Sequence, residues 1–216
     1  MTTKIQNICD FYRITHRLKN TLRNGWKVWE IDAQRFESVA EHIYGTQMLA
    51  LAINSEFNLG LDISRVALML AIHELGETIL GDVSVVNQKM SNAEKRKAEM
   101  DAVEKILAPL HNSQMIKDVY LEYENRETPE AKFAYLCDKL ECGIQCKFYE
   151  ETGCTDFDKK REGIFAELIE QSKENGCKTF AKAWIEYDKN KFNFAELNEL
   201  FTNIADYVAD NDIFKD

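Results

Sequence analysis

The scarcity of glycine and proline constrains this chain more than any other feature of its sequence. Only nine glycines and two prolines interrupt 216 residues. These two residues end helices and form most tight turns, so long stretches without them favour helices. The uninterrupted segments are rich in alanine, leucine, glutamate and lysine, and no segment of note has the pattern of a strand. We therefore expect an all-α fold and a single domain at 1–216, long enough to bury a substantial core.

The overall charge and the cysteines exclude several classes of protein. The formal net charge of −10 argues against a nucleic-acid-binding surface, although a small anionic substrate needs only a few cations at one site. Residues 1–7 lack the apolar core of a secretion signal, and no apolar run approaches the roughly 20 residues of a membrane span. The six cysteines form no CxxC pair and are expected to be reduced thiols of a cytoplasmic protein without a membrane partner.

Capping signals indicate where several helices begin. Ser38 is followed by Glu41, and Ser91 by Glu94, at the spacing of a capping box, in which each side chain bonds a free backbone N–H group. Pro129 is typical of a first helical position. The expected helices span about 4–22, 38–57, 62–77, 91–107 and 113–124, then one from 129 past 144, then 158–175, 179–187 and 194–209.

A histidine and two carboxylates follow the apolar run Val66–Leu70. His73 precedes Glu74 directly, and in a continuous helix Glu77 would lie nearly above His73, because four residues turn the helix by about 400°. Imidazole and carboxylate groups at the edge of a buried helix cost free energy unless they are paired or bind a metal. A satisfied core pair and a metal site both remain open, and an ordered loop is expected at 83–90.

Two further helices carry polar residues among apolar ones. His42 shares a helix face with apolar side chains and could be a core histidine, while Asp138 could form a cap or a salt bridge with a neighbouring lysine. Together with His73 and Glu74 they offer two imidazoles and two carboxylates from three helices. Such a set suits one divalent ion, which could be Mn, Co, Fe, Ni, Zn or Mg, and leaves room for water and substrate.

A loop between the first two helices combines tryptophans with cations. Trp26 and Trp29 offer flat stacking faces, while Arg23 and Lys27 can contact a phosphate. This loop could form the edge of a ligand site or a hydrophobic flap packed on the core. Arg35 is a further candidate cation.

The pattern His42, His73-Glu74 and Asp138 resembles the His … His-Asp … Asp motif of the HD-domain metal-dependent phosphohydrolases. The surrounding segments, Glu37–His42, His73–Asp82 and Cys137–Glu141, are similar to those of the 5′-deoxynucleotidase branch. The resemblance covers about residues 10–150 and implies a helical HD-domain bundle, with accessory C-terminal helices at about 156–216. It also implies a homodimer.

The resemblance implies a reaction as well. A metal-activated water would remove the 5′-phosphate of a (deoxy)ribonucleoside monophosphate, a small nucleotide substrate. Glu77 would orient or deprotonate the water, and Asp82 would assist the leaving oxygen or hold the sugar. Related proteins contact phosphate and deoxyribose through a basic residue and a tryptophan, which points to Lys27 and to Trp26 or Trp29.

One residue departs from the family pattern. Glu74 stands where the family has aspartate, and the extra methylene moves the carboxylate outward by roughly 1–1.5 Å. Glutamate is a legitimate metal ligand. Two alternatives follow: an HD-type hydrolase of another nucleotide phosphate ester, and a catalytically weakened nucleotide- or metal-binding protein.

Overall fold

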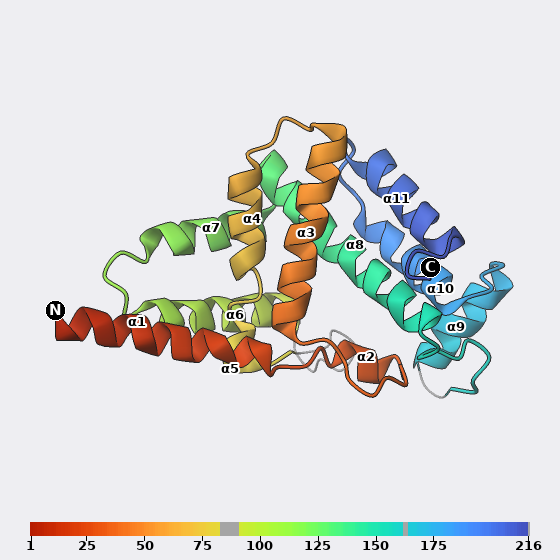
Figure 1. Ribbon diagram of the computed structural model, residues 1–216, viewed down its shortest axis with the longest axis horizontal. Coiled ribbons are helices and arrows are strands. Elements are labelled where there is room, and N and C mark those ends of the chain that lie inside the picture. The colour runs from red at the N-terminus through yellow and green to blue at the C-terminus, as the bar shows by residue number, and fades with distance from the viewer. Residues whose placement is uncertain (83–90, 162–163, 216) are drawn as a thin grey trace. The chain divides into compact units, whose positions relative to one another are not determined.

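The computed structural model describes residues 1–82, 91–161 and 164–215, and it is helical throughout, as Figure 1 shows. The described residues contain no β-strand, and one isolated antiparallel bridge joins Leu22 to Ser38. The all-α expectation is thereby confirmed. No helix among the described residues has both the length and the apolar character to cross a membrane. The loop expected at 83–90 lies outside the described residues.

The chain divides into two compact units, which we call the first and the second unit. The long helix α8, Pro129–Glu151, begins in the first unit and continues into the second. The expectation of one domain at 1–216 stays a prediction. The first unit comprises Met1–Val28 and Phe36–Tyr135, and the second comprises Trp29–Arg35 and Leu136–Asp216.

The first unit contains most of the helices. In it α3 packs along α4, α4 along α7, and α6 against both α1 and α5 (Figure 1). Its elements are α1 (Thr2–Thr15), the 3-10 helix η1 (His16–Lys19), α2 (Gly25–Val28), α3 (Val39–Phe57), α4 (Ile63–Ile72), α5 (Glu77–Leu80), α6 (Asn92–Leu107), α7 (Gln114–Asn125) and the start of α8.

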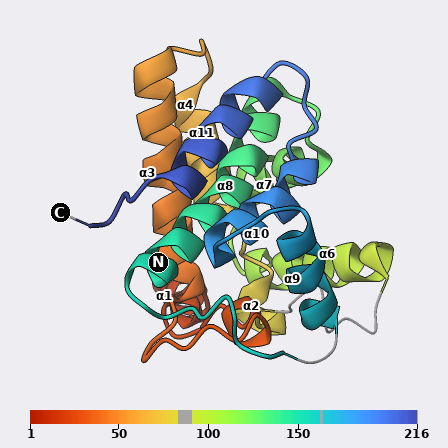
Figure 2. The same cartoon turned by 90° about the vertical axis from the view of Figure 1, so that its right-hand side faces the viewer.

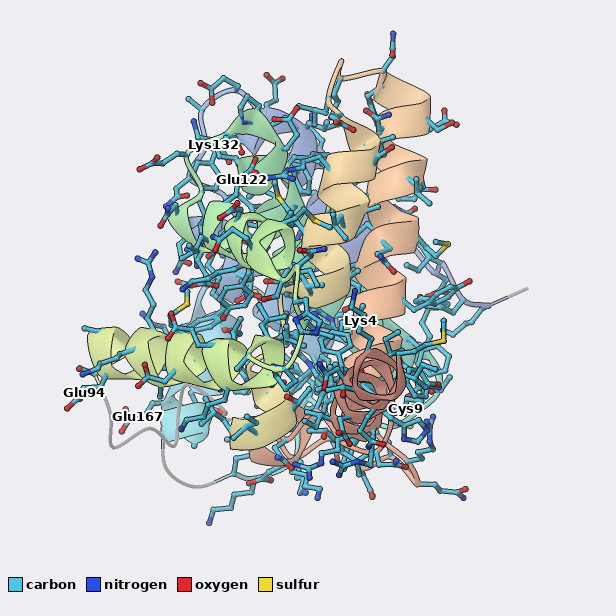
Figure 3. All side chains as sticks on the ribbon, turned by 90° about the vertical axis from the view of Figure 1, so that its left-hand side faces the viewer. Lys4, Cys9, Glu94, Glu122, Lys132 and Glu167 are labelled. Carbon is cyan, nitrogen blue, oxygen red and sulfur yellow. The ribbon has the colours of Figure 1, made fainter. Side chains whose placement is uncertain are left out.

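Three of the expected helix starts are confirmed at atomic detail. Both capping boxes are present: the Ser38 and Ser91 hydroxyls accept the backbone N–H groups of Glu41 and Glu94, whose carboxylates accept in return. Glu94 is labelled at the first turn of α6 in Figure 3. Pro129 occupies the first position of α8. Local sequence alone thus determined where these helices begin.

Four expected helices are shorter than predicted. The helices expected at 158–175 and 194–209 begin at Ile164 and Asn198. The N-terminal helix ends at Thr15 and tightens into η1 instead of running to 22. The expected helix through Glu77 is also wrong, because α4 ends at Ile72 and Glu77 begins the separate α5. The chain turns between them through i to i−3 bonds, and the His73 ring bonds the carbonyl of Leu70 near the end of α4.

A close approach of Gly76 to α6 accounts for the turn between α4 and α5. A Cβ added at Gly76 would lie 3.3 Å from backbone and side-chain atoms of Glu99 on α6. Only glycine lets the turn approach that helix without displacing it. Beside it lies an apolar cluster of buried side chains, which comprises Leu75, Val103, Ile106, Leu107 and Tyr120.

A polar clamp joins three helices of the first unit. The Glu122 carboxylate on α7, labelled in Figure 3, accepts the Nε–H of Arg65 from α4 at 2.9 Å and the Thr128 hydroxyl at 2.8 Å. The Thr128 hydroxyl also accepts the backbone N–H of Ala131 at the start of α8. These bonds fix α4 and α8 to α7.

The second unit contains the accessory C-terminal helices that the sequence predicted. Here α10 packs against α9 and α11, as Figures 1 and 2 show. A Cβ on Gly143 of α8 would lie 3.1 Å from Ile185, so glycine permits close packing of α8 on α10. Its further elements are α9 (Ile164–Glu174), α10 (Phe180–Asp188), the 3-10 helix η3 (Lys189–Lys191) and α11 (Asn198–Asp210).

Candidate functional site

Three of the predicted metal ligands converge in the first unit. His42 lies on α3, one turn after its capped start, and His73 lies directly after α4, with ring centroids 5.5 Å apart. The Oε1 atom of Glu74 lies 4.0 Å from His42 Nε2 and 3.7 Å from His73 Nε2. All three offer ligand atoms within 4.8 Å of one another. Both histidines are buried, so water alone does not solvate this cluster.

The His73 ring is held in one tautomer. Its Nδ1 atom lies 2.8 Å from the Leu70 carbonyl oxygen, which can only accept a hydrogen bond. Nδ1 therefore carries the proton, and in the neutral ring Nε2 presents its lone pair toward Glu74. A backbone carbonyl bonded to the far nitrogen is the usual support of a metal-binding histidine.

Glu74 is also held from the side of the tryptophan-containing loop. Arg23 Nη1 donates to Glu74 Oε1 at 3.0 Å, and Arg23 Nε lies 3.9 Å from Glu37 Oε1. The same Glu37 oxygen accepts the indole N–H of Trp26 at 2.9 Å. Arg23 and Trp26, both predicted from the sequence to contact substrate, thus lie in one network with the His73-Glu74 pair.

Glu77 and Asp82 lie nearby in the first unit, and their carboxylates are in different environments. Burial raises the pKa of Glu77 well above its ordinary value, and the charges of Glu74 and Asp82 raise it further, against the lowering effect of Arg23 and Lys95. A raised pKa makes a carboxylate a stronger base, which suits a group that accepts a proton from water.

Asp82 anchors the same loop. Its carboxylate accepts the backbone N–H of Asn24, and its carbonyl oxygen accepts the Asn24 side-chain amide at 3.1 Å. Both bonds hold the residue next to Arg23. Asp82 therefore stabilises the position of this loop through Asn24.

Asp138 lies on α8 in the second unit. It is buried, and its Oδ2 atom lies 2.7 Å from the ammonium group of Lys139. This is the salt bridge with a neighbouring lysine that the sequence left open beside the metal-ligand role.

The other predicted substrate-binding residues are dispersed. Trp29 belongs to the second unit, where its ring centroid lies 5.8 Å from that of Phe180 and 4.6 Å from that of Trp184. Arg35 is exposed in the same unit, and Lys27 is exposed on α2 of the first. Their substrate contacts stay predictions.

Three residues that contact the site carry little or no signal in the sequence. Glu37 lies within a family-like segment, whereas no motif marks Asn24 or Tyr123. Yet Glu37 accepts bonds from the loop, Asn24 bonds Asp82, and the Tyr123 ring centroid lies 5.2 Å from that of His73. Only Glu37 could have been found, as an acidic residue directly before a helix cap.

The donor set determines the chemistry that is available. Two imidazoles and a carboxylate at this spacing fit a divalent metal ion, and a buried carboxyl group with a raised pKa stands in the next element. Metal-assisted hydrolysis is the reaction class that uses such a combination.

One protein family and several known proteins match most of this chain. Residues 15–180 match the HD domain family. A 5′-deoxynucleotidase HDDC2 of Danio rerio is 33% identical, over 68% of this chain and 72% of its own. The 5′-deoxynucleotidase hdd1 of Schizosaccharomyces pombe is 34% identical, over 68% and 74% respectively.

Solved structures are similar in fold. A conserved hypothetical protein of Pyrococcus furiosus superposes with a TM-score of 0.60 at 27% identity, covering 76% of this chain and 92% of its own. A protein of Magnetospirillum magnetotacticum, titled a predicted metal-dependent phosphohydrolase, gives 0.62 at 23% identity, covering 95% of each chain, and so supports the fold alone. The family match spans most of the sequence, and two relatives exceed 30% identity. This chain belongs to the HD-domain family.

Proposed function

We propose that this protein is a metal-dependent phosphohydrolase that removes the 5′-phosphate of (deoxy)ribonucleoside monophosphates, most readily in the deoxy series. One observation carries the proposal. The histidines and the carboxylate of the HD pattern, His42, His73 and Glu74, lie within 4.8 Å of one another in a chain about one third identical to two 5′-deoxynucleotidases.

His42, His73, Glu74 and Asp138 are the proposed ligands of one divalent ion, which could be Mn, Co, Fe, Ni, Zn or Mg. The lone pair of His73 Nε2, directed at Glu74, supports this assignment. Asp138 is proposed from its place in the family-like segment Cys137–Glu141. When bound, such an ion polarises the phosphoryl group and lowers the pKa of a water molecule.

Glu77 is the proposed general base. Burial and the charges of Glu74 and Asp82 raise its pKa, which makes its carboxylate a stronger base than that of an ordinary glutamate. Asp82 would assist the leaving 5′-oxygen or hold the sugar.

The loop of residues 22–29 is the proposed substrate edge. The fork of Arg23 can bind phosphate oxygens in pairs, and the exposed Lys27 adds a second cation. Trp26 would exclude a 2′-hydroxyl by its bulk. Trp29 and Arg35 remain further candidates, although Trp29 packs among aromatic rings of the second unit.

The remaining features are proposed on resemblance and composition. We propose a homodimer in the cytoplasm, a single domain at 1–216 and no nucleic-acid partner. The six free cysteines and the net charge of −10 support the compartment and the lack of a nucleic-acid partner. Light scattering should give twice the mass of one chain.

Phosphate release tests the proposed activity. Metal-stripped protein is assayed with deoxy- and ribonucleoside monophosphates after addition of Mn²⁺, Co²⁺, Mg²⁺ or Zn²⁺. We expect metal-dependent release that favours the deoxy series. Release from a nucleoside triphosphate or cyclic nucleotide alone would assign a different phosphate ester. Metal binding without any release would indicate a weakened site, and Glu74→Asp would then be the variant that restores turnover.

A further inference from the structure

We infer that Glu37 is a positioning residue, which holds Arg23 and Trp26 and, through Arg23, sets the place of the Glu74 carboxylate. This inference rests on the metal site of the proposed function. It goes beyond that site because Glu37 is not among the residues grouped as metal ligands, and its contact with Arg23 links it to Glu74.

The Glu37 carboxylate joins the two loop residues. It is 7% exposed, and its Oε1 atom accepts the Trp26 indole N–H at 2.9 Å while facing Arg23 Nε at 3.9 Å. A buried carboxylate that makes these contacts keeps its charge only while the cation stays close. The three side chains therefore hold one another in place.

Backbone bonds fix Glu37 itself. The Arg23 N–H donates to the Glu37 carbonyl at 3.0 Å, and the Val39 N–H donates to the Thr21 carbonyl at 2.8 Å. Ser38 then caps α3, which carries His42. Glu37 thus stands at the junction between the substrate loop and the first metal-ligating helix, where a fixed carboxylate can align both.

Arg23 carries the effect to Glu74. Its Nη1 donates to Glu74 Oε1 at 3.0 Å, and that oxygen is the one that faces both histidines. A glutamate has one more rotatable bond than the aspartate of the family pattern, so its carboxylate needs an external partner to stay in one place. The Glu37–Arg23 pair supplies that partner.

The test is a double-mutant cycle on metal affinity. Calorimetry measures the Kd for Mn²⁺ of the metal-stripped full chain, wild type against Glu37→Gln, which keeps the shape and removes the charge. We expect about 10- to 100-fold weaker binding, as is usual when a supporting partner of a ligand is lost. With Glu74→Asp, whose carboxylate is one methylene shorter and is expected to lose the Arg23 bond, Glu37→Gln should change the affinity less than threefold.

Glu41→Gln is the matched control. It removes a charge four residues away, from an exposed side chain, and glutamine still completes a capping box. Its Kd should stay within threefold of wild type. Equal effects of the two variants, or a lower melting temperature of Glu37→Gln with an unchanged Kd, would overturn the inference.

A metal-free measurement separates this inference from the proposed function. The indole N–H resonance of Trp26, assigned with Trp26→Phe, should shift in Glu37→Gln and also in Glu74→Gln, which does not alter the contacts of Trp26 itself. No shift in Glu74→Gln would overturn the relay through Arg23. Protein that binds no metal, yet shows both shifts, would overturn the metal site and leave the relay supported.

Discussion

Trp26 and Trp29 stand three residues apart in the sequence but belong to different units and environments. The Trp26 indole donates to the buried Glu37 beside Arg23, whereas Trp29 packs against Phe180 and Trp184. Both are nearly inaccessible to solvent. Trp26 lies on α2 and Trp29 directly follows that helix, so residue type and sequence position do not separate them. Only their partners distinguish a side chain near the candidate chemistry from one that stabilises a core.

Charged residues also differ by their environment. In the second unit Lys182 and Lys189 share Asp206, whose side chain is 39% exposed, and such exposed ion pairs add little stability. In the first unit Glu77 is buried with its pKa raised. Buried groups that face one another, and not the number of charges, indicate where chemistry can occur.

The largest expected effect is at the metal ligands of the first unit. His73→Ala should weaken Mn²⁺ binding more than 100-fold, since even a supporting partner of a ligand costs about 10- to 100-fold. Calorimetry on stripped protein measures it. His111→Ala removes an exposed imidazole of the same unit and should leave Kd unchanged. An equal loss of Mn²⁺ affinity in both variants would contradict the assignment of His73 as a metal ligand.

Glu77→Gln should come next in size. Removal of a general base typically costs about 10²- to 10⁴-fold in kcat, while metal affinity should change little because Glu77 is not a proposed ligand. Steady-state phosphate release and calorimetry give the two values. Glu104→Gln, on the exposed face of α6, serves as the control. Normal turnover in Glu77→Gln would refute its catalytic role.

Substitutions of the two tryptophans should affect different quantities, kcat/KM for Trp26 and the free energy of unfolding for Trp29. Trp26→Phe removes a hydrogen bond to a charged group and should lower kcat/KM by about 10- to 100-fold, given about 1.5–3 kcal/mol for such bonds. Trp29→Ala empties an aromatic cluster and should cost about 3–5 kcal/mol of unfolding free energy. Kinetics at low temperature and urea unfolding measure them. A kinetic loss confined to Trp29→Ala would reverse the assignment of the two residues.

The smallest expected effect is on the pH dependence of stability, at Glu151 of the second unit. Burial alone would raise the pKa of Glu151, but bonds from the backbone N–H groups of Ile213 and Phe214, with the Lys147 ammonium, lower it below its ordinary value of 4.5. A lowered folded-state pKa means that the charged carboxylate stabilises the fold above that ordinary value. This contribution is lost as the pH falls through the lowered pKa.

Glu151→Gln should therefore be less stable than wild type by about 1 kcal/mol at pH 7 and by less at pH 3. Urea unfolding at both pH values measures the difference, and Mn²⁺ affinity at pH 7 should not change. A difference in stability that grows on acidification would have the wrong sign for this explanation.

Local chemistry predicted the helix starts better than the helix ends. Ser38, Ser91 and Pro129 act through neighbours within three residues, so the sequence alone reveals them. The end of α4 at Ile72 depends on Gly76 approaching Glu99, a contact between segments far apart in the sequence. Periodicity therefore extended the helix too far.

The residues of the site likewise divide into those that the sequence reveals and those that only the structure reveals. The pairing of His42 with His73 and Glu74 could be anticipated, because family-like spacing marks each of these residues. The bond from Arg23 to Glu74 and the burial of Glu37 could not, since they arise where a loop meets two helices. Nothing local to residues 23–29 separates the partners of Trp26 from those of Trp29.

One titration tests the central claim most directly. Mn²⁺ is added stepwise to the stripped full chain while bound metal and hydrolysis of a deoxyribonucleoside monophosphate are measured in the same samples. We predict that turnover rises in proportion to bound metal, that both reach a plateau at about one ion per chain, and that both vanish in His73→Ala. Turnover without metal, or full metal binding and turnover in His73→Ala, would contradict a catalytic metal site built on His42, His73 and Glu74.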